Sequence, residues 1–182
     1  AAWHQAPVRV DRELGALQSF SLAAGRAVDA EVLFRMASEQ IASLLGAEMA
    51  GVLLLDSSGA ALAAHPTFFG VDPALIETIQ VPVPAGSRLA ELWQDADGWL
   101  SNDLSSDPVA LEVGLDQLTS WVGIRQALLA PLIVGGWPVG ALLVANRRDG
   151  GPFTPDDIRL VNVMAAQTAV IQANTRLQAE AQ

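Results

Sequence analysis

The sequence predicts an α+β domain built on an antiparallel sheet that is covered on both faces. The main indication is residues 126–147, where two apolar runs flank Gly135-Gly136, a dipeptide that tolerates positive φ and suits a tight hairpin turn. Neither run alternates between apolar and polar residues, so we expect both faces of this hairpin to be covered by helices or long loops. Pro131 predicts a bulge or an edge position in its strand, and Pro138 marks where the second strand begins.

Two helices are expected before any strand. Residues 1–10 have no period and are expected to form a disordered tail, whereas residues 11–28 carry one apolar stripe at helical spacing. A second helix begins at the N-cap Asp29 and stops at Gly46. The shorter elements are then, in chain order, strands at 49–56 and 60–65, a helix that starts at Asp72-Pro73, an extended segment at 81–84, a helix at 87–95, a strand at 99–102 and a helical run over 109–118.

The last helix has the clearest start. Thr154 is its N-cap, Pro155 suits the first helical position, and Asp156 and Asp157 lie where the helix dipole favours acids. No Gly or Pro interrupts residues 155–181, which predicts a helix about 40 Å long. That is longer than a domain of this size needs.

Composition limits the classes of function. The 182 residues suit a single domain, and the absence of Cys excludes disulfides, thiolate nucleophiles and cysteine-held metals. The ten basic residues, all Arg, face twenty acids, and the net charge of −10 argues against binding to nucleic acid or anionic lipid. No apolar run reaches the ~18 residues of a membrane helix, and no signal peptide is visible, so we expect a cytoplasmic location without membrane insertion.

Short motifs follow one another through the second half of the chain. They are Asn102-Asp103, Asp107-Pro108, Ile124-Arg125, Ala130-Pro131-Leu132, Gly140-Ala141-Leu142, Asn146-Arg147, Phe153-Thr154-Pro155-Asp156-Asp157, Ala165-Ala166-Gln167 and Asn174-Thr175-Arg176-Leu177. With the order of elements, they resemble the GAF domain, a small-ligand sensory module of signalling proteins, over residues 29–177. The resemblance implies a PAS-related antiparallel sheet of five or six strands, terminal helices on one face, and short helices and loops over a pocket on the other. Residues 178–182 would begin a linker to an output domain.

The resemblance leaves the cofactor unknown, because GAF domains bind cyclic nucleotides, bilins, haem, iron, small metabolites or nothing known. A covalent bilin and the methionine-sulfoxide reductases built on this fold both need Cys, which this chain lacks. The cyclic-nucleotide signature is matched in part by Asn146, Arg147, Phe153 and Asp157, but Ile158 stands where its Glu would be. Arg147 and Asp157 are therefore interpreted as a structural ion pair that fastens the hairpin to the last helix.

Several polar and aromatic residues are expected to line the pocket. The candidates are His65, Phe68, Trp93, Asn102, Trp121 and Arg125. Each has a second interpretation, since indoles also pack in cores, Arg125 could pair with a loop acid, and His65 could be a partly buried hydrogen-bonding residue. Haem is disfavoured because His65 and the tail residue His4 are the only histidines. No metal site is expected, because Asx turns and helix capping explain Asp103 and Asp107.

Partner binding has better support than catalysis, because no nucleophile elbow, His/Asp pairing or phosphate loop is visible and an enzyme is not expected. The last helix carries two apolar stripes, Leu160, Met164, Ile171 and Leu177 in one and Ile158, Val161, Ala165 and Thr168 in the other. One stripe could face the sheet and the other a partner, which predicts a parallel homodimer through the terminal helices. The expected function is a sensory module that binds a small ligand, dimerises or does both, and so controls an output domain such as a histidine kinase or nucleotide cyclase. The alternative is a ligand-free dimerisation scaffold.

Overall fold

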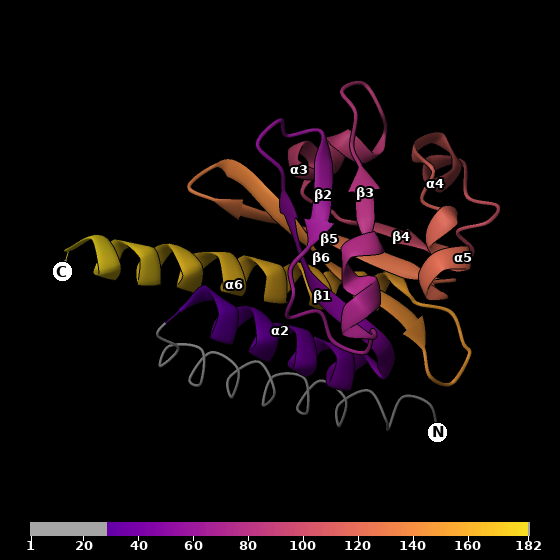
Figure 1. The fold of residues 1–182 in the computed structure, drawn as a ribbon, viewed down its shortest axis with the longest axis horizontal. Helices are drawn as coiled ribbons and strands as arrows, with labels where there is room; N and C mark the ends of the chain where they lie inside the picture. Colours follow the sequence, from indigo (N-terminus) through magenta and orange to yellow (C-terminus); the bar gives the residue numbers. More distant parts are fainter. Residues whose placement is uncertain (1–28, 182) are drawn as a thin grey trace.

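The computed structural model describes residues 29–181, which form a six-stranded antiparallel sheet with helices on both faces (Figure 1). The strands lie in the order β3-β2-β1-β6-β5-β4. The helix expected over residues 11–28 and the tail before it lie outside the described residues. The elements are α2 (Ala30–Leu45), β1 (Ala47–Leu55), β2 (Ala61–Ala64), η1 (Pro73–Thr78), β3 (Gln80–Pro82), η2 (Leu89–Glu91), α3 (Leu92–Asp95), β4 (Trp99–Ser101), α4 (Pro108–Val113), α5 (Gln117–Val122), β5 (Ala127–Val134), β6 (Trp137–Arg147) and α6 (Pro155–Ala181).

The central hairpin of β5 and β6 confirms the strongest sequence prediction. Gly135 and Gly136 make its turn at positive φ values of 57° and 82°, which glycine adopts without steric cost. The neighbouring residues Leu128 and Leu129 point to opposite faces of the sheet, and both are fully buried. Pro131 lies in the part of β5 that extends beyond β4, close to a bulge in the pairing with β6.

Two apolar layers enclose this sheet. The long helices α2 and α6 lie side by side on one face, where Phe34, Ile41 and Met164 belong to a buried cluster (Figure 1). The short helices and loops cover the other face, where Leu53 and Ile124 belong to a second buried cluster. This is the α+β arrangement that the sequence predicts.

Both long helices begin at the predicted caps, because side chains there satisfy backbone N–H groups of the first turn. The Oδ1 atom of Asp29 accepts a hydrogen bond from the Val32 N–H at 2.8 Å, and Gly46 ends α2 with a φ of 63°. At the start of α6 the Thr154 N–H donates to Oδ2 of Asp157 at 2.8 Å. The Asp157 N–H donates back to the Thr154 hydroxyl at 3.3 Å, so a capping box defines this helix start.

Two expectations about helices need correction. The run over residues 109–118 is divided into α4 and α5, because Gly114 adopts a φ of 76° and ends α4. The described members of both α6 stripes are buried or half-buried, because α6 contacts both α2 and the sheet. Among the α6 side chains that the structure describes, the large exposed apolar ones are instead Val163 and Val170, at 45% and 60% exposure.

Candidate ligand site

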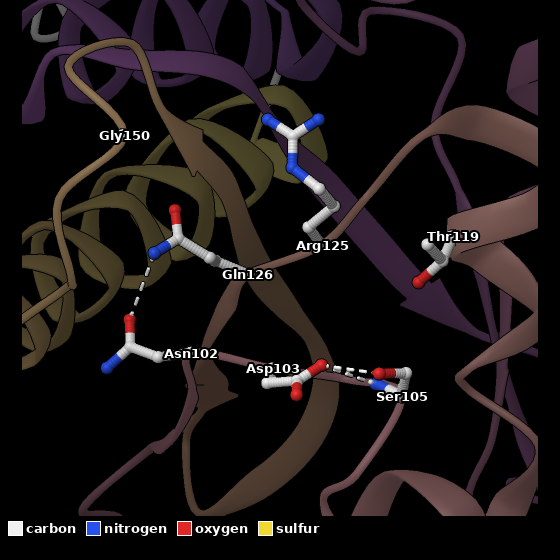
Figure 2. Close-up of a pocket in the computed structure, with 7 residues that line it drawn as sticks. All are labelled: Asn102, Asp103, Ser105, Thr119, Arg125, Gln126 and Gly150. Carbon is white, nitrogen blue, oxygen red and sulfur yellow. Dashed lines mark hydrogen bonds between the residues drawn. The ribbon is translucent and has the colours of Figure 1, made fainter.

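A pocket of about 380 Å³ lies where the loops after β4 and β6 meet the start of β5. Sheet pairing brings these segments together, since the end of β4 and the end of β6 flank the first residue of β5, Ala127. Figure 2 shows the side chains arranged around this space. The lining residues are Asn102, Asp103, Ser105, Thr119, Arg125, Gln126 and Gly150.

Two amide side chains of the pocket hold the loop that leads into α6. The Oδ1 atom of Asn102 accepts from the Phe153 N–H at 2.7 Å, and its Nδ2 donates to the Phe153 carbonyl at 3.1 Å. Gln126 donates through Nε2 to the Gly151 carbonyl at 2.9 Å and accepts through Oε1 from the Arg147 N–H at 3.1 Å. The pocket wall is therefore directly connected to the residues that precede the N-cap of α6.

Asn146 holds the segment that leads into β5, which forms part of the same pocket. Its backbone is in the left-handed region at a φ of 57°, and its side chain is buried. Its Oδ1 accepts from the N–H groups of Arg125 and Gln126 at 2.8 and 3.2 Å, and its Nδ2 donates to the Gly123 carbonyl at 2.8 Å and to Oε2 of Glu48 at 3.3 Å. The sequence placed Asn146 in the partial cyclic-nucleotide signature but not among the pocket candidates. The signal that could have found it is an Asn at a strand end, a residue that tolerates positive φ.

Arg125 supplies the positive charge of the pocket. Its backbone N–H is held by Asn146, but its exposed guanidinium has no hydrogen bond or ion pair with any described residue. Figure 2 shows that this guanidinium is turned away from the Asp103 carboxylate. The group is therefore available to an anion, as a planar fork of N–H donors.

The two acids beside the pocket are engaged locally. Asp103 accepts hydrogen bonds from the Ser105 hydroxyl at 2.6 Å and the Ser106 hydroxyl at 2.8 Å, and these bonds hold the pKa of its carboxyl below the ordinary value. Asp107 caps α4 by accepting from the N–H groups of Val109 and Ala110 at 2.8 and 3.2 Å. These contacts are turn and cap interactions rather than metal coordination.

His65 and Phe68 lie away from this pocket, on opposite faces of the sheet. The imidazole of His65 meets the ring of Phe34 edge-on at 5.1 Å between ring centroids, and its Nδ1 lies 2.8 Å from the Thr67 hydroxyl oxygen. Burial lowers the pKa of this imidazole below its ordinary value. Phe68 belongs to the cluster under the short helices, where its ring lies so close to Gly51 that an added Cβ would sit 2.0 Å from Cδ2.

The two candidate indoles occupy other places. Trp93 donates its Nε1–H to the Gly140 carbonyl at 2.8 Å and lines a groove near the β5–β6 hairpin. Trp121 is 52% exposed and lies beside η1. Of the six candidates, the structure thus brings only Asn102 and Arg125 into one pocket, because the others sit on elements that sheet pairing separates.

Arg147 lies between the β6–α6 loop and the start of α6. Its Nη1 is 3.7 Å from Oδ2 of Asp157 and donates to the Pro152 carbonyl at 3.1 Å. A shorter contact of 2.8 Å joins Nη2 to Oδ2 of Asp149. The hydrogen bond from the Gly151 N–H, and then Arg147, keep the pKa of the Asp149 carboxyl below the ordinary value. Arg147 therefore holds the loop as well as the helix.

A family model described as GAF domain matches residues 27–171. The chain belongs to the GAF domain family. The GAF domain of a phosphoenolpyruvate-protein phosphotransferase (ptsP) from Coxiella burnetii is similar, with a TM-score of 0.70, 14% identity and coverage of 92% of this chain and 96% of that one. Residues 122 to 287 of a methyl-accepting chemotaxis protein are also similar, with a TM-score of 0.68, 19% identity and coverage of 87% of this chain and 98% of that one. Free methionine-R-sulfoxide reductase from Neisseria meningitidis, in complex with its substrate, has a TM-score of 0.68 and 15% identity, with coverage of 91% of this chain and 91% of that one.

Similarity at these identities establishes the GAF fold and leaves the ligand open. The comparison with curated proteins found no match. Among residues 29–181 of this GAF domain, no group of three or more His, Asp or Glu side chains could hold a metal ion. In the same part of the chain, no helix combines the length and apolarity needed to cross a bilayer.

Proposed function

We propose that this chain is the sensory GAF module of a signalling protein, in which a small anion binds the Arg125 pocket and thereby controls a linked output domain such as a histidine kinase or nucleotide cyclase. The observation that carries the proposal is the connection between pocket and helix. Asn102 and Gln126 line the pocket and also bond Phe153 and Gly151, just before α6. A ligand that displaces either amide changes the start of α6. To signal, it must bind two arrangements of this helix with different affinity.

The chemistry of the lining favours a carboxylate or phosphate group as the part of the ligand that is recognised. The Arg125 guanidinium offers paired N–H donors to this space. The hydroxyls of Ser105 and Thr119 line it too, but their protons are donated to Asp103 and to the Ile124 carbonyl. The net charge of −10 repels anions at long range. Selectivity would therefore come from short-range contacts to Arg125.

A parallel homodimer through the terminal helices is the second part of the proposal. Val163, Ala166 and Val170 are exposed on α6 at spacings of three and four residues, the pattern of a coiled-coil seam. The same surface on a second copy would bury these side chains. Because the pocket wall is hydrogen-bonded to the loop just before α6, and α6 carries this seam, ligand binding and helix pairing would be coupled.

A cytoplasmic location and the absence of enzymatic activity belong to the same proposal. The chain has no Cys, which removes the residue that thiol-based reductases on this fold require. Its negative charge argues against nucleic acid as a partner.

Isothermal titration of the chain with inorganic phosphate and with acetate tests the ligand class. We expect Arg125→Ala to abolish the binding seen with the wild type, whereas Arg88→Ala should leave it unchanged. Arg88 is an exposed arginine that lines a different pocket. Hydrogen exchange over residues 150–158 should speed up when the anion is bound, because displacing Asn102 removes the acceptor of the Phe153 N–H. Failure of the wild type to bind either anion, or equal binding by Arg125→Ala, would contradict an anion site.

A ligand-free dimerisation scaffold is the second candidate function. It is favoured by the buried apolar cluster under the short helices, where Phe68 lies against Gly51. Native mass spectrometry of the purified chain separates the two functions. A dimer that retains one small molecule per chain supports the sensor, and a dimer without one, together with no anion binding, supports the scaffold. A monomer at tens of micromolar would contradict dimerisation in either form.

A further inference from the structure

A second and larger concavity lies at the other end of the sheet. A groove of about 920 Å³ is formed by the β1–β2 turn, the segment after β3, α3 and the β5–β6 hairpin. Figure 1 shows the β1–β2 turn, α3 and the hairpin at the same end of the sheet. Among the described residues, the groove and the Arg125 pocket have no lining residue in common, so this inference does not rest on the function proposed above.

Two indoles line this groove. Trp137 follows the hairpin turn and is 76% exposed, so core packing does not account for it. Trp93 is half-buried, and the hydrogen bond from its Nε1–H to the Gly140 carbonyl fixes its orientation. Because the N–H of Trp93 is already satisfied, its remaining capacity for interaction is the π-face and apolar edge of the ring. Aromatic faces attract cations and apolar groups.

The described lining of the groove carries only negative charge. Asp56 is the only charged side chain among its described lining residues. The carboxylate accepts hydrogen bonds at Oδ1 from the Ser58 hydroxyl at 2.7 Å and the Ala60 N–H at 3.3 Å, which fix its position on the turn. Without a basic residue in the described lining, this carboxylate is not neutralised within the groove. The net charge of −10 raises the local concentration of cations further.

We propose that this groove binds a small organic cation of the quaternary ammonium type. The N-methyl groups of such a cation fit against indole faces, and its charge is complementary to Asp56. A metal ion is a poorer fit, because a single carboxylate provides too few oxygen ligands. An anion is excluded by charge, and a neutral apolar molecule would leave the carboxylate unused.

Isothermal titration with choline tests this site, and its uncharged analogue 3,3-dimethylbutan-1-ol is the matched control ligand. Both are measured at constant ionic strength. Choline is expected to bind at least about tenfold more tightly than the neutral analogue. Trp137→Ala and Asp56→Asn should each weaken choline about tenfold. Trp121→Ala, which removes an exposed indole elsewhere, should leave choline binding unchanged.

Each other outcome overturns the proposal. Equal affinity for choline and the neutral analogue would show an apolar groove without charge recognition. Absence of choline binding to the wild type, or binding that Trp137→Ala and Asp56→Asn both leave intact, would show that the groove is not a cation site. Thermal unfolding of each variant, measured alongside, verifies that the fold is retained. Since these substitutions lie outside the Arg125 pocket, anion binding there is expected to persist in all of them.

Discussion

The two ends of β6 are stabilised in different ways. At Asn146, the side-chain amide provides the hydrogen bonds that a neighbouring strand would otherwise provide. Its partners are backbone groups from separate segments of the chain. At Gly140, near the hairpin, the strands approach so closely that an added Cβ would lie 2.0 Å from the Leu53 carbonyl oxygen. One end thus depends on the functional groups of a side chain, and the other on the absence of a side chain.

The largest expected effect is at the hairpin end of β6, where Gly140 lies, rather than at the polar end, where Asn146 lies. Gly140→Ala should lower the free energy of unfolding by about 3 kcal/mol, because the new Cβ meets backbone that can yield only if β1 and β6 separate. Urea denaturation measures the change. Gly151→Ala is the matched control at the polar end, where the nearest atom to an added Cβ is Oδ1 of the Asp149 side chain at 3.2 Å, and its effect should stay within about 0.5 kcal/mol. Equal effects of the two substitutions would remove the distinction between the ends.

The polar end is tested by Asn146→Ala. We expect a loss of about 2 kcal/mol in the free energy of unfolding, because buried N–H and carbonyl groups lose their partner. Asn146→Gly, which suits the φ of 57° but also lacks the amide, separates backbone strain from hydrogen bonding. If Asn146→Gly were as stable as the wild type, the hydrogen bonds of this side chain would contribute nothing measurable.

The smallest expected effect compares an exposed acid near each end, Asp56 and Asp149. The pKa of each carboxyl is lowered in the folded state, chiefly by the Ser58 hydroxyl for Asp56 and by the Gly151 N–H for Asp149. Since the folded pKa lies below the unfolded one, each acid contributes stability above pH 3.8 that is lost as the pH falls through the folded value. The unfolding midpoints of Asp56→Asn and Asp149→Asn, measured as the pH is lowered, should therefore fall slightly less steeply than that of the wild type below pH 3.8. An unchanged or steeper decline would contradict these interactions.

The sequence was most informative where structure depends on near neighbours. The caps Asp29 and Thr154 and the turn Gly135-Gly136 could all be predicted, because the groups involved lie within a few residues of each other. The two stripes of α6 were harder to interpret, since periodicity does not reveal that a helix contacts α2 and the sheet together.

The candidate pocket was beyond such reasoning for a physical reason. Asn102 bonds Phe153, 51 residues away, and Asn146 bonds Arg125, 21 residues away. These distances are closed only by the pairing of β4, β5 and β6, which fixes where their loops meet. Asn102 and Arg125, which both belong to motifs that resemble the GAF family, nevertheless lie in one pocket, whereas the aromatic candidates are distributed over the molecule.

The distribution of indoles also determines what spectroscopy can detect. The chain has five Trp and no Tyr, so its intrinsic fluorescence comes almost entirely from indoles. Trp137, at 76% exposure, places a quenchable fluorophore directly at the hairpin groove. The described residues that line the Arg125 pocket include no indole. An occupant of the groove would therefore alter the emission directly, whereas an occupant of the Arg125 pocket would be nearly silent in fluorescence and would have to be found by heat or by mass.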